Sequence, residues 1–130
     1  MPSKCRVLVA DDNRDAADSL VGLLQAWGHH AHAAYDGEAA YEEFVCFHPD
    51  IAILDVQMPR MDGCLAAARM RVHDRPPGLI VSLTGLGHDQ EPMKSHGDVF
   101  DEHLSKPCDP DELEKLLRRW QEAARVPPGA

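Results

Sequence analysis

Ile51-Ala52-Ile53-Leu54-Asp55 is a stretch in which four apolar residues lead directly into an aspartate. A run that is apolar at every position is typical of a parallel strand that helices cover on both faces. In open α/β sheets, ligands bind beyond the carboxyl ends of such strands. The stretch therefore predicts the class of fold, and Asp55 marks the sheet edge at which we expect the function.

Four more short apolar runs have the same character. They are Cys5–Ala10, His30–Tyr35, Leu79–Leu83 and His103–Ser105. Helical segments are expected over Arg14–Trp27, Glu38–His48, Leu65–Val72, Glu91–His96 and from Pro110 to Ala124,. Strands that alternate with helices predict an α/β fold with right-handed crossovers. We expect a single (βα)5 doubly wound parallel sheet with the flavodoxin-like strand order 2-1-3-4-5, in which the first and third strands are neighbours.

The length and composition fit one domain. The chain has 130 residues, of which 44% are hydrophobic, and its net charge is −9. This is enough apolar material for a packed core, and we assign residues 1–126 to the domain and 127–130 to a tail. The acidic balance disfavours nucleic acid and membrane surfaces as partners, because both attract basic residues.

Nothing in the sequence predicts export or a membrane span. The N-terminal residues do not resemble a signal peptide, and no run reaches the roughly 18 apolar residues that a membrane helix needs. The four cysteines show no metal-binding spacing, and we expect them to be reduced and mostly buried,. These features favour a cytoplasmic protein.

Three aspartates follow strands that are predicted to lie side by side. Asp11 and Asp12 come after the first strand, and Asp55 follows the apolar run of the third, so folding is expected to gather their carboxylates. Crowded carboxylates repel one another. Mg²⁺ relieves this repulsion, because it takes oxygen ligands from a few carboxylates, water and phosphate. The alternative is that these residues only cap the next helix, for which Asp12 and Asn13 are both candidates.

The next two strand ends carry a hydroxyl group and a cation. Thr84 follows the fourth strand, and Lys106 follows the fifth. Each is ordinary by itself, since threonine is common in strands and lysine is common on surfaces. Together with the aspartates they form the set that phosphoryl transfer requires, namely a carboxylate nucleophile, a metal, a hydrogen-bond donor and a positive charge.

Four motifs at these strand ends resemble those of the receiver domain of two-component response regulators. They are Val-Leu-Val-Ala-Asp-Asp-Asn at 7–13, Leu-Asp-Val-Gln-Met-Pro-Arg-Met-Asp-Gly at 54–63, Leu-Thr-Gly-Leu-Gly at 83–87 and Leu-Ser-Lys-Pro at 104–107. The motifs stand in the order of the family, and the resemblance covers nearly the whole chain. Two positions depart from the usual residues of the family. Gly85 stands where alanine is common, and His103 stands where tyrosine or phenylalanine is common.

The resemblance implies a role for each strand-end residue. Asp55 would accept a phosphoryl group from a sensor histidine kinase or a histidine phosphotransfer protein, and Thr84 and Lys106 would contact the phosphoryl oxygens. Pro59 and Gly63 would shape the loop after the third strand. The implied ligands of Mg²⁺ are Asp11, Asp12, Asp55 and, through its backbone carbonyl, Gln57. Phosphorylation would switch a surface that binds a downstream effector protein or an output domain. Apart from this self-phosphorylation and dephosphorylation, the domain would not be an enzyme.

Other functions fit parts of the pattern. A haloacid-dehalogenase-like phosphatase also uses an aspartate and Mg²⁺, but it needs a second carboxylate two residues later, where this chain has Gln57,. A receiver-like interaction module that is not phosphorylated would not need the acids, Thr84 and Lys106. A metal site at His29-His30-x-His32 would lack a fourth ligand,.

Several properties stay open at this point. The sequence does not identify the cognate kinase, the pathway, the oligomeric state or the lifetime of the phosphoryl group. It does not decide whether His103 takes part in a switch. The chain fits a stand-alone regulator, a shuttle in a phosphorelay, or a part of a hybrid kinase or a larger regulator.

Overall fold

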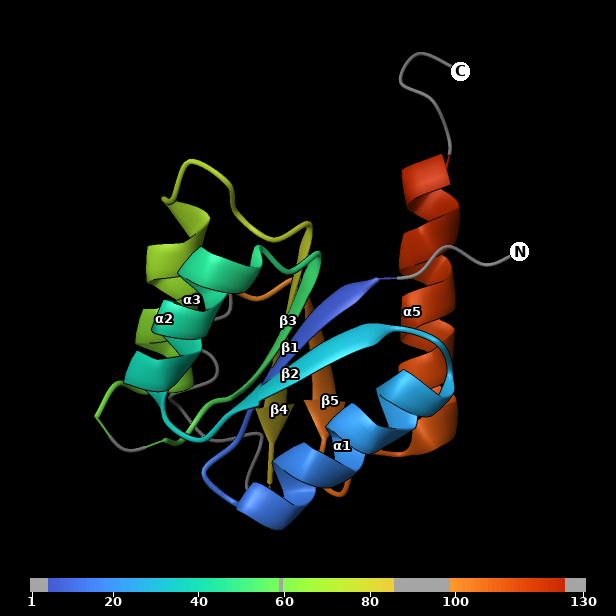
Figure 1. The fold of residues 1–130 in the computed structure, drawn as a ribbon, viewed down its shortest axis with the longest axis horizontal. Helices are drawn as coiled ribbons and strands as arrows, with labels where there is room; N and C mark the ends of the chain where they lie inside the picture. The colour runs from blue at the N-terminus through green and yellow to red at the C-terminus, as the bar shows by residue number, and fades with distance from the viewer. Residues whose placement is uncertain (1–4, 59, 86–98, 126–130) are drawn as a thin grey trace.

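The computed structural model describes residues 5–58, 60–85 and 99–125, whose fold is shown in Figure 1. Five strands form one parallel sheet, and they are β1 (Arg6–Ala10), β2 (His30–Ala34), β3 (Ile51–Asp55), β4 (Leu79–Thr84) and β5 (Glu102–Ser105). Their order across the sheet is β2-β1-β3-β4-β5. The predicted parallel sheet and its strand order are therefore confirmed, and β1 lies beside β3.

The helices of the described residues cover both faces of the sheet. They are α1 (Arg14–Ala26), α2 (Gly37–Phe47), α3 (Gly63–Arg71) and α5 (Pro110–Arg125). Figure 1 shows α2 and α3 on one side of the sheet and α1 and α5 on the other, which is the doubly wound arrangement. The helix expected over Glu91–His96 lies outside the described residues. None of the helices in the described ranges is both long and apolar enough to span a membrane.

Polar side chains fix where the first three helices begin. The side chain of Asn13 accepts a hydrogen bond from a first-turn backbone N–H of α1, so Asn13 rather than Asp12 is the cap. Asp36 and Asp62 cap α2 and α3 in the same way. Because each cap sets the first helical residue, α2 and α3 begin at the glycine after the cap, slightly earlier than predicted.

The last helix begins at Pro110, as predicted, and one of its faces is apolar. Asp109 Oδ1 accepts a hydrogen bond from the backbone N–H of Asp111 at 2.9 Å, as expected of a residue that caps a helix. Leu113, Leu116 and Leu117 are buried against the sheet. The spacing of these leucines places them on one face of the helix.

Residues of each strand alternate between two cores, one on each face of the sheet. The core on the side of α1 and α5 includes Val7, Val9, Ile51, Ile53, Val81 and Leu83. The core on the side of α2 and α3 includes Leu8, Ala10, Ala52, Leu54 and Ile80. Side chains of a strand point to opposite faces with a period of two, so Asp11 and Asp55 continue the rows that face α1 and α5.

The cysteines only partly follow the expectation. All four are free. Cys5 and Cys64 are buried, as expected, whereas Cys108 is partly exposed and Cys46 is exposed. The prediction of mostly buried thiols is therefore correct for two of the four positions, because Cys46 lies on a face of α2 that the sheet does not cover.

Candidate functional site at the carboxyl edge of the sheet

The ends of four neighbouring strands carry the residues that the sequence pattern selected. The register of β1 and β3 makes Asp11 and Asp55 neighbours at the carboxyl edge. Thr84 ends β4, and its carbonyl accepts a hydrogen bond of 2.6 Å from the backbone N–H of Lys106, just after β5. Strand order and register together therefore bring residues from four distant parts of the sequence to one edge.

Three carboxylates form a compact acidic cluster. Asp11, Asp12 and Asp55 each offer a carboxylate oxygen, and these oxygens all lie within 4.8 Å of one another. Asp11 is fully buried and Asp55 is only 4% exposed, whereas Asp12 is exposed. Such a cluster can hold a metal ion through one oxygen from each residue, with the exposed Asp12 on the solvent side.

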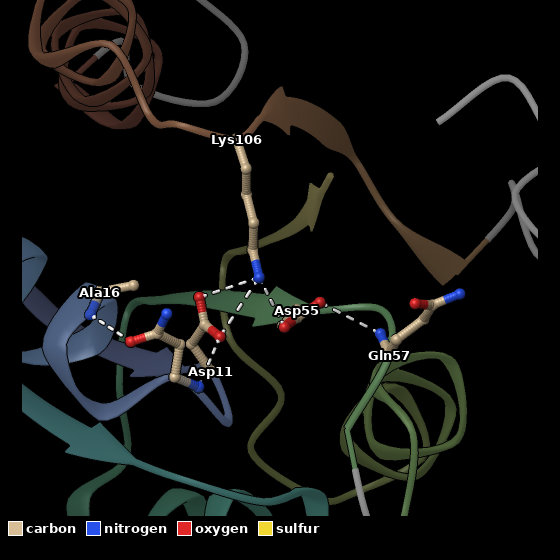
Figure 2. Close-up of polar contacts among 6 residues, drawn as sticks. Asp11, Ala16, Asp55, Gln57 and Lys106 are labelled. Atoms are coloured by element: carbon tan, nitrogen blue, oxygen red, sulfur yellow. Dashed lines mark hydrogen bonds and ion pairs between the residues drawn. The ribbon is translucent and has the colours of Figure 1, made fainter. Parts of the chain in front are cut away.

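The ammonium group of Lys106 lies between the two buried aspartates, as Figure 2 shows. Its Nζ donates a hydrogen bond of 2.7 Å to Asp55 Oδ2. It also lies 3.2 Å from Asp11 Oδ1 and 3.1 Å from Asp11 Oδ2. The Lys106-Pro107 peptide bond is cis. One lysine thus partly neutralises two carboxylates that come from separate strands.

Both buried aspartates also hold the turn that follows their strand. Asp55 Oδ1 accepts a hydrogen bond from the backbone N–H of Gln57 at 3.1 Å, and Asp11 Oδ1 accepts one from Asn13 at 3.0 Å. Asp11 Oδ2 is buried and accepts no hydrogen bond from the described residues, so its contact with Lys106 is purely a charge contact. A buried carboxylate oxygen without a hydrogen bond is costly. This donor set of carboxylate oxygens fits a hard divalent cation such as Mg²⁺.

Burial and charge change the acid–base properties of the site. Burial raises the pKa of Asp55 to about 6, and the hydrogen bond from Lys106, which lowers the pKa, opposes this shift without cancelling it. Burial disfavours the charged form of Lys106, but the hydrogen bonds and charges of Asp55 and Asp11 outweigh it and raise the pKa of the ammonium. Lys106 therefore stays protonated, and Asp55 is a carboxylate that a second cation would stabilise.

Gly63 packs directly against the backbone of Asp55. A Cβ atom at Gly63 would lie 2.2 Å from the Asp55 carbonyl oxygen, which no side chain tolerates. The backbone N–H of Gly63 donates to the Val56 carbonyl at 2.9 Å. The glycine thus lets the start of α3 close the loop after β3. Pro59, the other residue expected to shape this loop, lies outside the described residues.

Comparison with known proteins identifies the family. The family model described as the response regulator receiver domain matches residues 7–118. This chain is a receiver domain of the response regulator family. It therefore belongs to the proteins of two-component signalling, and the resemblance of the four motifs is confirmed.

Three relatives illustrate the likeness. Response regulator MprA of Mycobacterium ulcerans is 35% identical over 121 residues, which cover 92% of this chain and 50% of MprA. Regulatory protein AtoC of Escherichia coli is 30% identical over 115 residues, or 88% of this chain and 24% of AtoC. The REC domain of AraT, a response regulator from Geobacillus stearothermophilus, is 25% identical with a TM-score of 0.80, covering 94% of this chain and 96% of that one. The chain spans half or less of the length of these two curated relatives.

The sequence pattern missed one side-chain contact of this receiver domain, beside Thr84. Ser82, fully buried on β4, shares a hydrogen bond of 2.5 Å with His103 Nδ1 on β5. The ring of His103 also faces the edge of Phe100 at 6.1 Å between centroids. The only hint in the sequence is that a serine interrupts the apolar run of β4. Thr84 itself is 8% exposed at the end of that strand.

The weaker metal hypothesis at the histidines is not supported by the side-chain contacts. His29 Nδ1 accepts a hydrogen bond from the backbone N–H of Cys5 at 3.1 Å. His32 pairs with Glu43 at 2.5 Å and stacks on Phe47 with centroids 3.8 Å apart. Within the described ranges, the acidic cluster is the one group of three or more such ligands with spacing suited to a metal.

Proposed function

We propose that this receiver domain accepts a phosphoryl group on Asp55 in a Mg²⁺-dependent reaction and thereby switches a partner-binding surface. The donor is the phosphohistidine of a sensor histidine kinase or a histidine phosphotransfer protein. The partner is a downstream effector protein or an output domain, and neither nucleic acid nor a membrane is a direct partner of this chain. The proposed location is the cytoplasm, where such kinases present their phosphohistidine.

One observation carries the proposal. The buried Asp55 carboxylate lies in a cluster of three acids, and the Lys106 ammonium is 2.7 Å from its Oδ2. A nucleophile, a set of metal ligands and a fixed cation therefore lie together at one sheet edge, where they can act on a single phosphoryl group. Asp55 Oδ1 accepts the hydrogen bond of the turn and Oδ2 accepts that of Lys106, so both oxygens of the carboxylate are held at the sheet edge.

The chemical step is a displacement at phosphorus. An oxygen of Asp55 forms a new P–O bond while the P–N bond to the donor histidine breaks. The imidazole leaves with the bonding electron pair and takes up a proton, and Asp55 becomes an acyl phosphate. Lys106 exchanges its hydrogen bond to the free carboxylate for one to a phosphoryl oxygen, which stabilises the negative charge on the transferred group.

Mg²⁺ would be held by the carboxylates of Asp11, Asp12 and Asp55 and by the Gln57 carbonyl, and it would neutralise charge on the phosphoryl oxygens. Asp11 brings to this set a buried oxygen that lacks a hydrogen bond within the described residues. The backbone N–H of Gln57 donates to Asp55 Oδ1, so the residue whose carbonyl would bind the metal is also linked, through its other peptide unit, to the nucleophile.

Thr84 is the residue that responds to the phosphoryl group. Its hydroxyl donates a hydrogen bond to a phosphoryl oxygen. This bond shifts the equilibrium between two conformations of the surface formed by β4, β5 and α5. The carbonyl of Thr84 already bonds the backbone N–H of Lys106. A change at Thr84 is therefore passed to the strand end that carries Lys106.

The test is labelling with a small phosphodonor, acetyl phosphate, in the presence of Mg²⁺. The wild-type chain should gain one phosphoryl group by intact-protein mass spectrometry, and Asp55→Asn should gain none. Asp50→Asn is the matched control, because Asp50 lies at the opposite end of the same strand. Labelling of Asp55→Asn at the wild-type level would show that another residue is the acceptor. Absence of Mg²⁺ binding at millimolar concentrations would instead favour an interaction module that is not phosphorylated.

A further inference from the structure

The first turn of α2 touches the loop that follows Asp55. Gly37, the first residue of α2, is buried. A Cβ atom at this position would lie 1.6 Å from the carbonyl oxygen of Met61 and 2.7 Å from the Met61 Cβ. The φ angle of Gly37 is not in the left-handed region, so the glycine is required for space and not for its backbone conformation.

This close approach is not shared by the other glycine within a long helix. Gly22 lies in α1, and a Cβ atom there would meet nothing within 4 Å. Both glycines are helical, and both lower helix propensity compared with alanine. The absence of a side chain therefore has a steric purpose at Gly37 that it does not have at Gly22.

Charged side chains on both sides of Gly37 hold the same loop. Arg60 lies in the left-handed region with φ 71, and its guanidinium faces the carboxylates of Asp36 and Glu38 at 3.9 and 3.7 Å. The other carboxylate oxygen of Asp36 caps α2. These ion pairs are partly exposed and weak one by one, but they join the helix start to the loop at the same place as the steric contact.

The loop is thus fixed at three points between Asp55 and α3. Gln57 donates its backbone N–H to Asp55 Oδ1, Met61 rests on Gly37, and Gly63 packs on the Asp55 carbonyl. The middle contact is the only one of the three that is made by an element other than β3 and α3. The position of the described loop residues 60–62 consequently depends on α2.

We propose that Gly37 is a positioning residue for the metal site, because it sets how closely the loop that carries the Gln57 carbonyl packs on α2. This inference rests on the proposed function, in which that carbonyl binds Mg²⁺. Gly37 touches neither the metal nor the phosphoryl group. It acts through the backbone of Met61.

The sensitivity of Mg²⁺ to geometry makes the effect measurable. Real Cβ atoms stay at least 3.0 Å from such a carbonyl oxygen, so a methyl group at Gly37 must separate helix and loop by more than an ångström. Mg²⁺ demands near-ideal octahedral geometry, and a displacement of about 1 Å at a site can cost roughly 100-fold in function. We therefore expect a shift of this size at Met61 to disturb the backbone ligand at Gln57, four residues earlier in the same loop.

The test compares Gly37→Ala with Gly22→Ala in the full chain. Mg²⁺ is titrated into each metal-free protein, with the Gln57 amide resonance and calorimetry as readouts, and the thermal stability of each protein is measured without metal. We expect Gly37→Ala to bind Mg²⁺ at least about tenfold more weakly than wild type. Gly22→Ala should bind within twofold of wild type, because its new methyl group meets no atom.

A second variant covers the case in which Gly37→Ala does not fold. The double change Asp36→Asn with Arg60→Gln removes the ion pairs, keeps an amide oxygen to cap α2 and leaves the net charge of the chain unchanged. We expect its affinity for Mg²⁺ to fall by about two- to fivefold, since exposed pairs are weak. Because the net charge is preserved, such a fall cannot come from a change in the overall attraction of the cation.

The outcomes separate this inference from the proposed function. If wild type binds Mg²⁺ and a folded Gly37→Ala binds it equally well, the inference is wrong, even if that variant is less stable. If Gly37→Ala is unfolded, the inference is overturned when the double variant binds Mg²⁺ with the affinity of wild type. If wild type itself does not bind Mg²⁺, the proposed function fails first.

Discussion

Two aspartates flank the central strand β3, and they have opposite surroundings. Asp50, just before the strand, is partly exposed, and its Oδ2 accepts a hydrogen bond of 2.9 Å from the backbone N–H of Arg6. Its own backbone N–H donates to the Arg6 carbonyl at 2.8 Å. Asp55, at the other end, is buried beside a second carboxylate and an ammonium group. Asp50 joins two strands, whereas Asp55 holds a charge that the fold only partly compensates.

The difference indicates what each end of the sheet contributes. At the amino end, the carboxylate has a backbone partner and solvent, so it stabilises the fold without conflict. At the carboxyl end, burial raises the pKa of Asp55 to about 6, which means that the fold disfavours the charged form. Sites that are arranged for chemistry often carry such uncompensated charge. The same strand thus has a structural end at Asp50 and, under the proposed function, a reactive end at Asp55.

The largest expected difference between the two ends concerns Lys106, which contacts Asp55 and has no counterpart in the described surroundings of Asp50. Lys106→Ala should lower the rate of labelling by acetyl phosphate by about 100-fold or more at saturating Mg²⁺, as expected when one charged donor to the transferred group is removed. Lys115→Ala is the control, because Lys115 is exposed on α5. Quench-flow or mass-spectrometric rates measure the effect, and a wild-type rate for Lys106→Ala would contradict it.

A second difference should appear in the stability of the metal-free protein. Asp55→Asn removes a buried charge that the fold disfavours, so it should raise the free energy of unfolding at pH 7.5 by about 1–3 kcal/mol. Asp50→Asn should leave it unchanged or slightly lower. Urea unfolding with a chelator present measures both. A destabilised Asp55→Asn would mean that Lys106 and the turn compensate the Asp55 charge fully.

The stabilising effect of Asp55→Asn should depend on pH. The pKa of Asp55 is raised from 3.8 to about 6 in the folded protein, so between these pH values the folded state binds more protons than the unfolded state. Its contribution to stability therefore falls as pH rises from about 4 to about 6 and is constant above that range. The difference in unfolding free energy between Asp55→Asn and wild type should grow over this window, and a difference that is flat with pH would argue against the raised pKa.

The smallest expected effect comes from Asp50, the structural end of the strand. Asp50→Ala removes the acceptor for the Arg6 backbone N–H and should cost about 1–2 kcal/mol of stability. Phosphoryl labelling should stay within twofold of wild type, since the carboxyl edge of the sheet is not touched. A strong loss of labelling in a folded Asp50→Ala would show that the two ends of β3 are coupled.

Much of the fold was predictable, because it depends on local patterns. The apolar runs placed the strands to within a residue or two of their observed ends, and Asn13 was one of the two cap candidates for α1,. The caps Asp36 and Asp62 were not predicted, which is why α2 and α3 begin earlier than expected. The strand order could be predicted because few crossover topologies are compatible with strands that alternate with helices. The strand-end residues of the candidate site then follow from the register.

Other features of the site could not be read from the sequence. Asp11 and Asp12 are adjacent and chemically identical, yet one is fully buried and the other exposed. The contact of Gly37 with Met61 and the bond between Ser82 and His103 join residues that are far apart in the chain. No local pattern specifies such contacts, because they depend on how helices pack against the sheet and against one another.

The sequence alone determined which strands form, where they end, and that acids, a hydroxyl and an ammonium lie at those ends, because strand alternation and helix caps act over a few residues. Only the tertiary structure decided that Lys106 contacts both Asp11 and Asp55 and that α2 supports the loop after β3. It also decided that one buried oxygen of Asp11 accepts no hydrogen bond from the part of the chain that the structure describes. These properties depend on distances of a few ångströms between separate elements, and such distances are fixed by close packing of the whole domain.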